Sequence, residues 1–383
     1  MQSELQFLLR HVKPTLNSAE ITDRPPATDS PPDWDSLLQI AVKHGVMPLL
    51  YLNLKQVKTE LNEPEQFTAR LRLAFQRNMS HSLRLTEELF NIINHLRQAN
   101  LRVIPFKGPV VSFLAYGDIV LRQSGDIDLL VQRERLSNIE AVLEEHGYQR
   151  QHPYTVAQEK RFLQVDCQHV FYNTEKDMTI DLHWEFAPSY WGIRLNTEEL
   201  WGRAQPTLVE NTWLESLAPE DNVLVLALSA AKDLFNRLIR LNDLAGFIQR
   251  HPDLDWPLIS ERANATGISR MLEVSLCLIS DLWHIPLPQA VADLSADGQS
   301  VQVLTRQAHR WLSQQIPAQG FKNSLLPAKL MNSRQNRLKF YLRLAFTPTL
   351  EDWQFIKLPE SLAFGYYFLR PLRLARKYLL RKK

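Results

Sequence analysis

The 383-residue chain is long enough for two or three domains with a sizeable apolar core. Its 44 Lys and Arg residues nearly balance 42 Asp and Glu residues, and its 45% hydrophobic content is that of an ordinary soluble protein. The two cysteines, Cys167 and Cys277, give no basis for a disulfide framework or a zinc site, which fits a reducing compartment. The start of the chain lacks signal-peptide features, and no apolar run approaches the ~18–20 residues that cross a bilayer, so we expect a cytoplasmic protein.

The first hundred residues are predicted to be mainly helical. Apolar residues recur at helical spacing over residues 1–20 and 35–50, on either side of a proline-rich loop at 24–34. Residues 64–98 have the pattern of one long amphipathic helix, and Asn100 is well suited to end it.

A small α/β unit is predicted between residues 99 and 190, because short β-like runs alternate with a helical pattern there. The fold class is therefore α+β, a small mixed sheet flanked by helical regions on both sides. The predicted elements are a strand at Leu101–Phe106, a helix at Val110–Tyr116 after a break at Lys107-Gly108-Pro109, a strand at Asp126–Val131, a helix at Arg133–His146, and two strands at 166–173 and 178–186.

Two carboxylates mark the strand at Asp126–Val131. Residues two apart in a strand point to the same face, so Asp126 and Asp128 project together while Ile127 and Leu129 point into a core. Two adjacent carboxylates repel each other unless a cation lies between them, and hard oxygen ligands suit Mg²⁺. The alternative is a solvated strand end with two surface aspartates.

A third carboxylate is predicted on the strand Thr179–Phe186, where Asp181, His183 and Glu185 share a polar face. Asp181 could therefore lie beside Asp126 and Asp128 and complete a metal site, in which it would also be the nearest base to an attacking hydroxyl. A register two residues different would put Asp177 or Glu185 in its place. His183 faces the carboxylates and could orient a substrate or be purely structural.

These motifs together resemble a known family. The residues that carry the resemblance are Lys107-Gly108, Tyr116, Arg122, Gly125-Asp126-Ile127-Asp128-Leu129-Leu130-Val131 and Asp181-Leu182-His183-Trp184. The stretch 100–186 is similar to the uncharacterised nucleotidyltransferase family NTP_transf_5, of the DNA polymerase β-like nucleotidyltransferase superfamily. The resemblance implies Mg²⁺-dependent (or Mn²⁺-dependent) transfer of a nucleoside monophosphate from an NTP such as ATP to an acceptor hydroxyl, with release of pyrophosphate.

Carried over to this chain, the resemblance implies that three carboxylates bind metal and catalyse and that a surrounding set binds the nucleotide. The catalytic and metal residues are Asp126, Asp128 and Asp181; the nucleotide and phosphate residues are Lys107, Gly108, Arg122, Ser124, Gly125 and Lys232; further candidates are His183 and Asp243. Pro109 stands where the superfamily has a small residue, so one N–H and one hydroxyl donor are missing. Lys107 and Arg122 are the natural substitutes, although Arg122 could instead pair structurally with an acidic neighbour.

The segment Asp221–Arg250 is the strongest helical pattern in the chain. On one continuous helix, Lys232, Asn236, Arg240 and Asp243 would form a single polar stripe, which needs either solvent or a cleft that contacts the nucleotide. We therefore expect Lys232 either in solvent or on the phosphate or base.

The last part of the chain is basic. From Gln299 onward, 16 Lys and Arg residues face 3 acidic ones, giving +13 (16 − 3), whereas the remainder carries −11 (28 − 39). Such a region could contact nucleic acid, an anionic surface such as lipid, or an acidic partner, and the alternative is a solvated, partly frayed end. The predicted domains are 1–98 (helical), 99–190 (nucleotidyltransferase core), 191–298 (helical) and 299–383 (basic, mostly helical).

The acceptor is left open between a small molecule, a saccharide, a protein and RNA. The basic region favours an anionic acceptor such as tRNA, which would make the protein a toxin-like RNA modifier. Because Pro109 weakens the phosphate turn, a non-catalytic nucleotide sensor on the same scaffold is the second hypothesis.

Overall fold

The computed structural model describes residues 2–14, 31–56, 63–193, 195–286, 298–314, 326–331, 334–356 and 358–379. Four helices precede the sheet: α1 (Gln2–His11), α2 (Trp34–His44), α3 (Met47–Gln56) and α4 (Glu65–Gln98). Asp33 caps α2 by accepting hydrogen bonds from the backbone N–H groups of Asp35 and Ser36. Asn100 adopts a left-handed conformation just after α4, as expected of a residue that ends a helix. The proline-rich loop lies mostly outside the described residues.

A five-stranded mixed sheet forms the centre of the fold, which confirms the predicted α+β class. The strands are β1 (Val103–Pro105), β2 (Ile127–Val131), β3 (Gln149–Arg150), β4 (Gln168–Asn173) and β5 (Met178–His183), in the order β1-β2-β5-β4-β3. Only β2 and β5 run parallel; the other neighbours are antiparallel. The parallel pair brings together the two strands on which the sequence predicts carboxylates.

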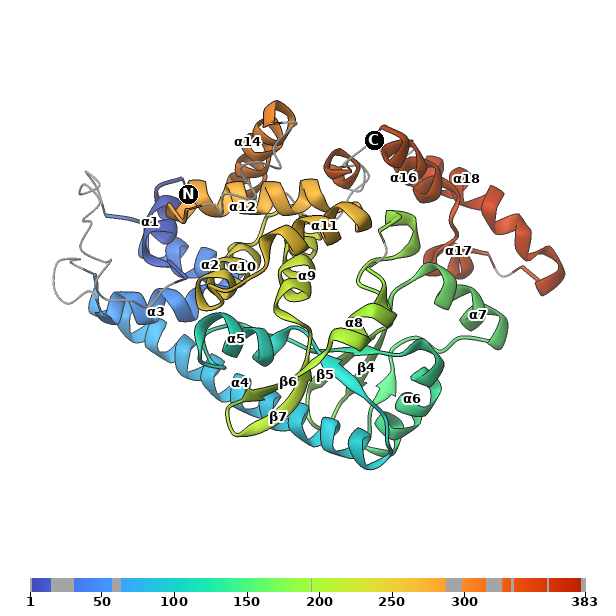
Figure 1. Cartoon of the computed structure of the whole chain (residues 1–383), viewed down its shortest axis with the longest axis horizontal. Coiled ribbons are helices and arrows are strands. Elements are labelled where there is room, and N and C mark those ends of the chain that lie inside the picture. Colours follow the sequence, from blue (N-terminus) through green and yellow to red (C-terminus); the bar gives the residue numbers. More distant parts are fainter. Residues whose placement is uncertain are drawn as a thin grey trace.

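The alternation along these two strands divides the core into two clusters. Ile127 and Leu129 of β2 join Ile180 of β5 in a cluster with α4 and α6 (Leu136–Glu145). Leu130 of β2 belongs instead to a larger cluster on the opposite face, which includes helices from both ends of the chain. Figure 1 shows α4 running along one side of the sheet, with α9 (Pro219–Lys232) and α10 (Leu238–Arg250) on the other. The carboxylates therefore face α10, and the apolar side chains face α4.

Several elements of this region were not predicted from the sequence. A helix, α7 (Val156–Val165), precedes β4, and its first turn is closed by a capping box between Thr155 and Gln158. After the 3₁₀ helix η3 (Ser189–Trp191) come α8 (Thr197–Arg203) and a hairpin of β6 (Gln205–Val209) and β7 (Thr212–Ser216), where the sequence pattern suggested helices alone. The strand at 178–186 was predicted too long, because β5 ends at His183.

The continuous helix predicted over Asp221–Arg250 is wrong. It divides into α9 and α10, and between them Leu234 (φ 53°) and Phe235 (φ 57°) take left-handed conformations. Both side chains are buried in the larger apolar cluster, and this burial compensates the backbone strain. The polar stripe expected on one helix is therefore split between two helices.

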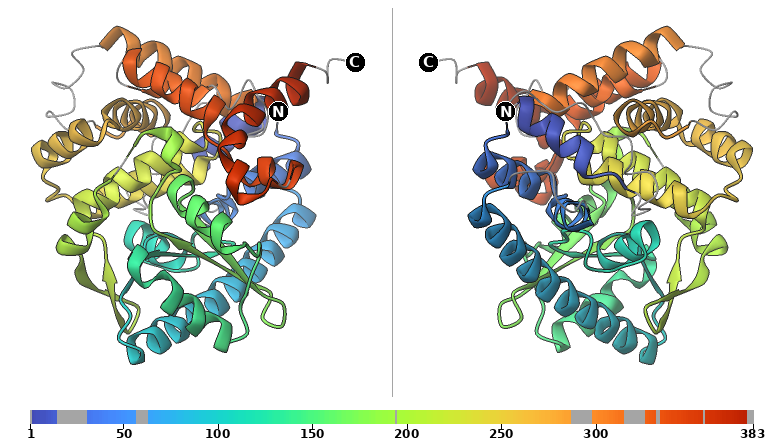
Figure 2. Two further views of the ribbon diagram at one scale, coloured as in Figure 1. Left: turned by 90° about the vertical axis from the view of Figure 1, so that its right-hand side faces the viewer. Right: turned by 90° about the vertical axis from the view of Figure 1, so that its left-hand side faces the viewer.

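The remaining chain is helical. Its elements are α5 (Gly108–Tyr116), η2 (Arg133–Arg135), α11 (Trp256–Thr266), α12 (Ser269–Trp283), α14 (Gly298–Gln314), η4 (Leu326–Leu330), α16 (Arg334–Phe346), α17 (Leu350–Phe355), η5 (Glu360–Gly365) and α18 (Tyr366–Leu379). The side views in Figure 2 place α14 and α4 at opposite ends of the molecule. Among the described residues, no helix is long and apolar enough to span a membrane. The four-part domain division remains a prediction.

The contact between α10 and α5 depends on Gly246. A Cβ atom at this position would lie 2.7 Å from the backbone oxygen of Ala115. Although alanine favours a helix over glycine by about 1 kcal/mol, we expect Gly246→Ala to lower the free energy of unfolding by about 1–3 kcal/mol through overpacking. Gly202→Ala in α8 is the matched control, because a Cβ there meets nothing within 4 Å. Equal stability of the two variants in urea unfolding would contradict the packing argument.

Candidate active site

The centre of the site is a pair of carboxylates on the parallel strands β2 and β5. Asp128 and Asp181 are direct partners in the register of this pair, so their side chains lie next to each other on the face that α10 covers. Asp128 is only 3% exposed, and its Oδ1 accepts hydrogen bonds from Nζ of Lys107 (2.6 Å) and Nε2 of His183 (2.9 Å). Asp181 accepts a hydrogen bond from Nε2 of Gln168 at 2.5 Å. The strand register expected from the sequence is therefore present.

The three carboxylates Asp126, Asp128 and Asp181 differ in the direction in which their pKa values are shifted. Burial, followed by the charges of Asp128 and Asp126, raises the pKa of Asp181 to about 7. Burial and the charge of Asp128 likewise raise the pKa of Asp126. Burial acts in the same direction on Asp128, but the positive charge of Lys107 and the hydrogen bond from His183 hold its pKa well below its usual range. Asp128 thus has a lowered pKa beside two carboxylates whose pKa values stay raised, although nearby cations act against the rise.

His183 is neutral at this site, because burial lowers its pKa to about 4. Its Nδ1 atom is buried without a hydrogen-bond partner among the described residues. Ligand atoms of Asp128, Asp181 and His183 all lie within 4.8 Å of one another. The sequence predicted a set of three aspartates, whereas this closest group contains His183, and Asp126 lies beside Asp128 at the start of β2.

The donor set suits a divalent cation. Carboxylate oxygens are the ligands that Mg²⁺ prefers, and a neutral imidazole also accepts Mn²⁺. Burial, and after it the repulsion between the carboxylates, raises the pKa values of Asp126 and Asp181, and a cation there would offset both. The residues present therefore fit the metal that the sequence motif implies.

Gly108 begins helix α5 directly beside the carboxylates. It has a left-handed conformation (φ 57°), and a Cβ atom would lie 3.3 Å from the backbone oxygen of Asp126. Glycine is favoured here for both its backbone and the close approach. The first N–H groups of a helix have no intrahelical acceptor and attract anions. Pro109 lacks one such group, but Val110 and Val111 retain theirs.

A cavity of about 350 Å³ opens beside Asp126 and Asp128. Four cationic side chains line it together with these two carboxylates and with Ser124 and Gly125, both named from the sequence. The cations are Lys107, Arg122, Arg237 and Arg240. Positive charge around paired carboxylates is what a metal-bound polyphosphate requires.

Arg237 was missed as a site residue, and Arg240 was expected only as part of the helical stripe. Arg237 precedes α10, and Arg240 lies in its first turn, where Nε donates to Oδ2 of Asp233 at 2.9 Å. Burial and the charge of Arg240 lower the pKa of Arg237. Both depend on the break after α9, because the turn at Leu234 and Phe235 directs the start of α10 towards the cavity. The sequence carries no glycine or proline that would announce this break.

Arg122 and Asp243 form a buried ion pair, the alternative that the sequence left open. Nε of Arg122 donates to Oδ2 of Asp243 at 2.9 Å, and the hydroxyl of Tyr116 donates to Oδ1 at 2.9 Å. A second nitrogen of Arg122 donates to Oγ of Ser124 at 2.8 Å. Asp243 is thus behind Arg122 and does not line the cavity, whereas Arg122 reaches it. Asp243 holds Arg122 in place.

Lys232 does not line this cavity. It is the last residue of α9, and its Nζ donates to the backbone oxygen of Phe186 at 2.7 Å. Burial lowers its pKa. The sequence predicted Lys232 either in solvent or at the phosphate cavity, and the structure places it in neither.

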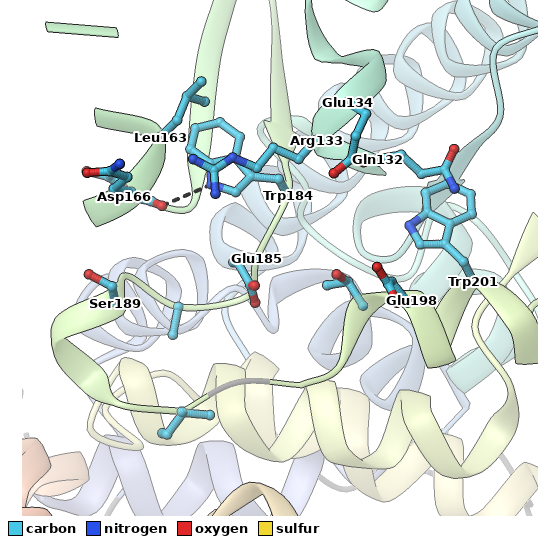
Figure 3. A pocket seen from close by; sticks show the side chains of 14 residues that line it. Gln132, Arg133, Glu134, Leu163, Asp166, Trp184, Glu185, Ser189, Glu198 and Trp201 are labelled. Carbon is cyan, nitrogen blue, oxygen red and sulfur yellow. Dashed lines mark hydrogen bonds between the residues drawn. The ribbon is translucent and has the colours of Figure 1, made fainter. Parts of the chain in front are cut away.

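A second cavity, of about 420 Å³, lies beyond the carboxyl ends of β2 and β5 (Figure 3). Its lining includes Trp184 and Trp201 and one arginine, Arg133. The acidic lining residues are Glu134, Asp166, Glu185 and Glu198. Nε1 of Trp201 is buried without a hydrogen-bond partner among the described residues. Glu185, which the sequence offered as a substitute for Asp181, belongs to this cavity.

Comparisons with known proteins identify a family and one similar structure. The sequence profile of NTP_transf_5, described as an uncharacterised nucleotidyltransferase, matches residues 30–284. Among solved structures, the antibiotic-resistance factor ANT(2'')-Ia is similar over 49% of this chain and 91% of its own, with 13% identity and a TM-score of 0.33. No curated protein matches the chain.

The raised pKa of Asp181 predicts the pH dependence of the metal-free protein. Between the ordinary value of 3.8 and the folded value of about 7, the folded state keeps a proton that the unfolded state releases. The contribution of Asp181 to stability should therefore fall as pH rises through this window, and Asp181→Asn should stabilise the protein relative to the wild type at about pH 8 by on the order of 2 kcal/mol. Thermal unfolding in a chelator at about pH 5 and about pH 8 measures both effects. A variant that unfolds like the wild type at both pH values would refute the assignment.

We expect loss of the ion pair between Arg122 and Asp243 to destabilise the fold strongly. Asp243→Ala leaves a buried guanidinium without its carboxylate, and we expect a loss of about 3–5 kcal/mol in the free energy of unfolding. Glu199→Ala removes the exposed carboxylate that pairs with Arg203 and should leave urea unfolding nearly unchanged. A small effect of Asp243→Ala would show that Arg122 finds another partner.

Proposed function

This chain belongs to NTP_transf_5, the family of uncharacterised nucleotidyltransferases, and we propose that it transfers a nucleoside monophosphate from an NTP to an acceptor hydroxyl at the cavity beside Asp126 and Asp128. The observation that carries the proposal is the register of Asp128 and Asp181 on adjacent parallel strands. This register puts two carboxylates side by side, as metal-dependent nucleotidyl transfer requires. They lie next to the start of α5, whose free N–H groups attract phosphate.

The nucleotide would be held by the cations and N–H groups around the carboxylates. Arg122 and Arg237 line the cavity and can bind phosphate oxygens through more than one N–H group. Gly108 lets the chain pass close to the phosphates, and the free N–H groups of α5 add to the positive field. Lys107, which now neutralises Asp128, can also contact a phosphate oxygen from this position.

Asp181 is the group best placed to accept a proton from the acceptor hydroxyl. Asp181 is the direct strand partner of Asp128, so an acceptor hydroxyl bound at the paired carboxylates would lie near its carboxylate. Asp126, Asp128 and Asp181 would hold Mg²⁺ or Mn²⁺, with His183 as a further ligand. When bound, the metal supplies charge stabilisation for the attacking oxygen and the leaving pyrophosphate.

The charge and the aromatic lining of the second cavity favour some classes of acceptor over others. Its four carboxylates and one arginine give it a negative charge, and two tryptophans add apolar ring faces. An anionic acceptor such as RNA is disfavoured at this cavity, because like charges repel. A neutral or cationic hydroxyl compound fits it better, and the tRNA alternative would need a different surface.

Activity can be tested with each labelled NTP, Mg²⁺ or Mn²⁺, and a cell extract as the source of acceptors. We expect pyrophosphate release and labelled product from the wild type, and a loss of about 100-fold or more in Asp181→Asn. Because this substitution is expected to stabilise the metal-free fold, unfolding cannot explain its loss of activity.

The matched control is Asp177→Asn, on the same hairpin. Asp177 accepts a hydrogen bond from the hydroxyl of Tyr172 in the β4–β5 turn, and this variant should keep wild-type activity. Full activity in Asp181→Asn would refute the proposal. Binding of the NTP without any pyrophosphate would favour the sensor hypothesis, and treatment of the extract with RNase separates an RNA acceptor from all others.

A further inference from the structure

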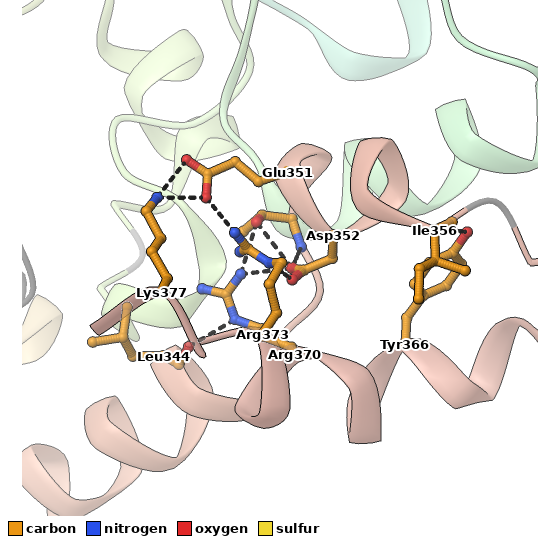
Figure 4. A network of polar contacts seen from close by, with 9 residues as sticks. Leu344, Glu351, Asp352, Ile356, Tyr366, Arg370, Arg373 and Lys377 are labelled. Carbon is orange, nitrogen blue, oxygen red and sulfur yellow. Dashed lines mark hydrogen bonds and ion pairs between the residues drawn. The ribbon is translucent and has the colours of Figure 1, made fainter. Parts of the chain in front are cut away.

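Three of the four cations of helix α18 are directed towards carboxylates of α17. Arg370 and Arg373 both pair with Asp352 at the start of α17, and Lys377 pairs with Glu351 (Figure 4). Asp352 is 2% exposed, so this network is buried at its centre. The hydroxyl of Tyr366 donates to the backbone oxygen of Ile356, and Trp353 packs into the core of the sheet. The network fixes which face of α18 is turned outwards.

The outward face is apolar. Phe368 is 68% exposed and Leu372 66%, and these two residues, four apart, lie on the same side of the helix. A soluble helix normally buries this face and exposes its charges, so α18 has the reverse arrangement. Eleven of the twenty large hydrophobic residues exposed in the described chain lie within residues 338–372, which makes this region an outlier. They are Leu338, Tyr341, Leu342, Phe346, Phe355, Ile356, Leu362, Phe364, Tyr367, Phe368 and Leu372.

Cations accompany the exposed apolar residues. Over the described parts of 334–379, eight Lys and Arg residues face three acidic ones, and two of the three acids are engaged by α18 itself. Within the described chain, no carboxylate partner is found for Lys339, Arg343 or Arg376, and all three are exposed. The surface is thus both apolar and positively charged.

We propose that α16, η5 and α18 dock this protein onto an anionic lipid surface, lying in the interface without crossing it. Exposed Phe, Tyr and Leu side chains enter the headgroup and acyl boundary, and neighbouring Lys and Arg contact anionic headgroups. Several large exposed apolar side chains within one region of the chain indicate an interaction site in a folded protein. The proposal is independent of the reaction at the carboxylates.

The charge argues for this occupant over two others. A second copy of the chain would bring one cationic surface against another, which disfavours self-association. RNA would satisfy the cations and could stack on the aromatic rings, but it offers no apolar medium for Leu338, Leu342 and Leu372. An anionic bilayer satisfies both features at once.

The test is flotation of the full chain with vesicles of phosphatidylcholine alone or with about 30% phosphatidylglycerol. We expect binding to the anionic vesicles only, weakened by salt, and at least about 10-fold weaker in Phe368→Ser/Leu372→Ser. The control is Leu83→Ser/Trp213→Ser, which removes a leucine and an aromatic residue of similar exposure (50% and 59%) on α4 and β7. It should bind like the wild type.

Absence of binding to the anionic vesicles would overturn the proposal, as would equal binding by the two double variants. Concentration-dependent dimers in sedimentation that disappear in Phe368→Ser/Leu372→Ser, without vesicle binding, would assign the surface to a second copy and also overturn it. Binding of RNA in place of vesicles would do the same. Equal thermal unfolding of both variants shows that the fold is intact.

Discussion

The structure depends on how it accommodates negative charge at the centre of a sheet. Parallel pairing of β2 and β5 places Asp128 directly beside Asp181, with Asp126 close by. Charges in such a position destabilise a fold unless other groups compensate them. Lys107 and His183 bond directly to Asp128 and lower its pKa, whereas burial and mutual repulsion keep the pKa values of Asp126 and Asp181 raised. The fold therefore keeps a site that binding of a cation would stabilise.

The surrounding elements can be understood as responses to this constraint. The close passage of Gly108 over the backbone of Asp126 starts α5 at the carboxylates, and α10 closes the cavity from the other side with Arg237 and Arg240. Asp243 lies behind Arg122 and accepts its Nε–H, which leaves other N–H groups of the guanidinium for the cavity. The four cations thus come from three separate parts of the chain, because Lys107 precedes α5, Arg122 precedes β2, and Arg237 and Arg240 belong to the start of α10.

The sequence was most informative where local patterns determine structure. Strict alternation on β2 and β5 placed Ile127, Leu129 and Ile180 in the core and the aspartates opposite them, and a glycine marked the start of α5. It was least informative where tertiary packing overrides propensity. Leu234 and Phe235 have no local reason to leave a helix, and only their burial explains the break that brings Arg237 to the cavity. The partner of Arg122 was equally hidden, because Asp243 is more than a hundred residues away.

The basic C-terminal region shows why net charge alone does not define a surface. Its excess of cations suggested a polyanion as partner, but the structure uses Arg370, Arg373 and Lys377 to hold α18 against α17. This internal pairing determines the side of α18 that faces water, and that side carries Phe368 and Leu372. The cations that remain exposed therefore lie next to an apolar face. A partner must therefore match two properties, and apolar complementarity distinguishes a lipid surface from the nucleic acid that charge alone would suggest.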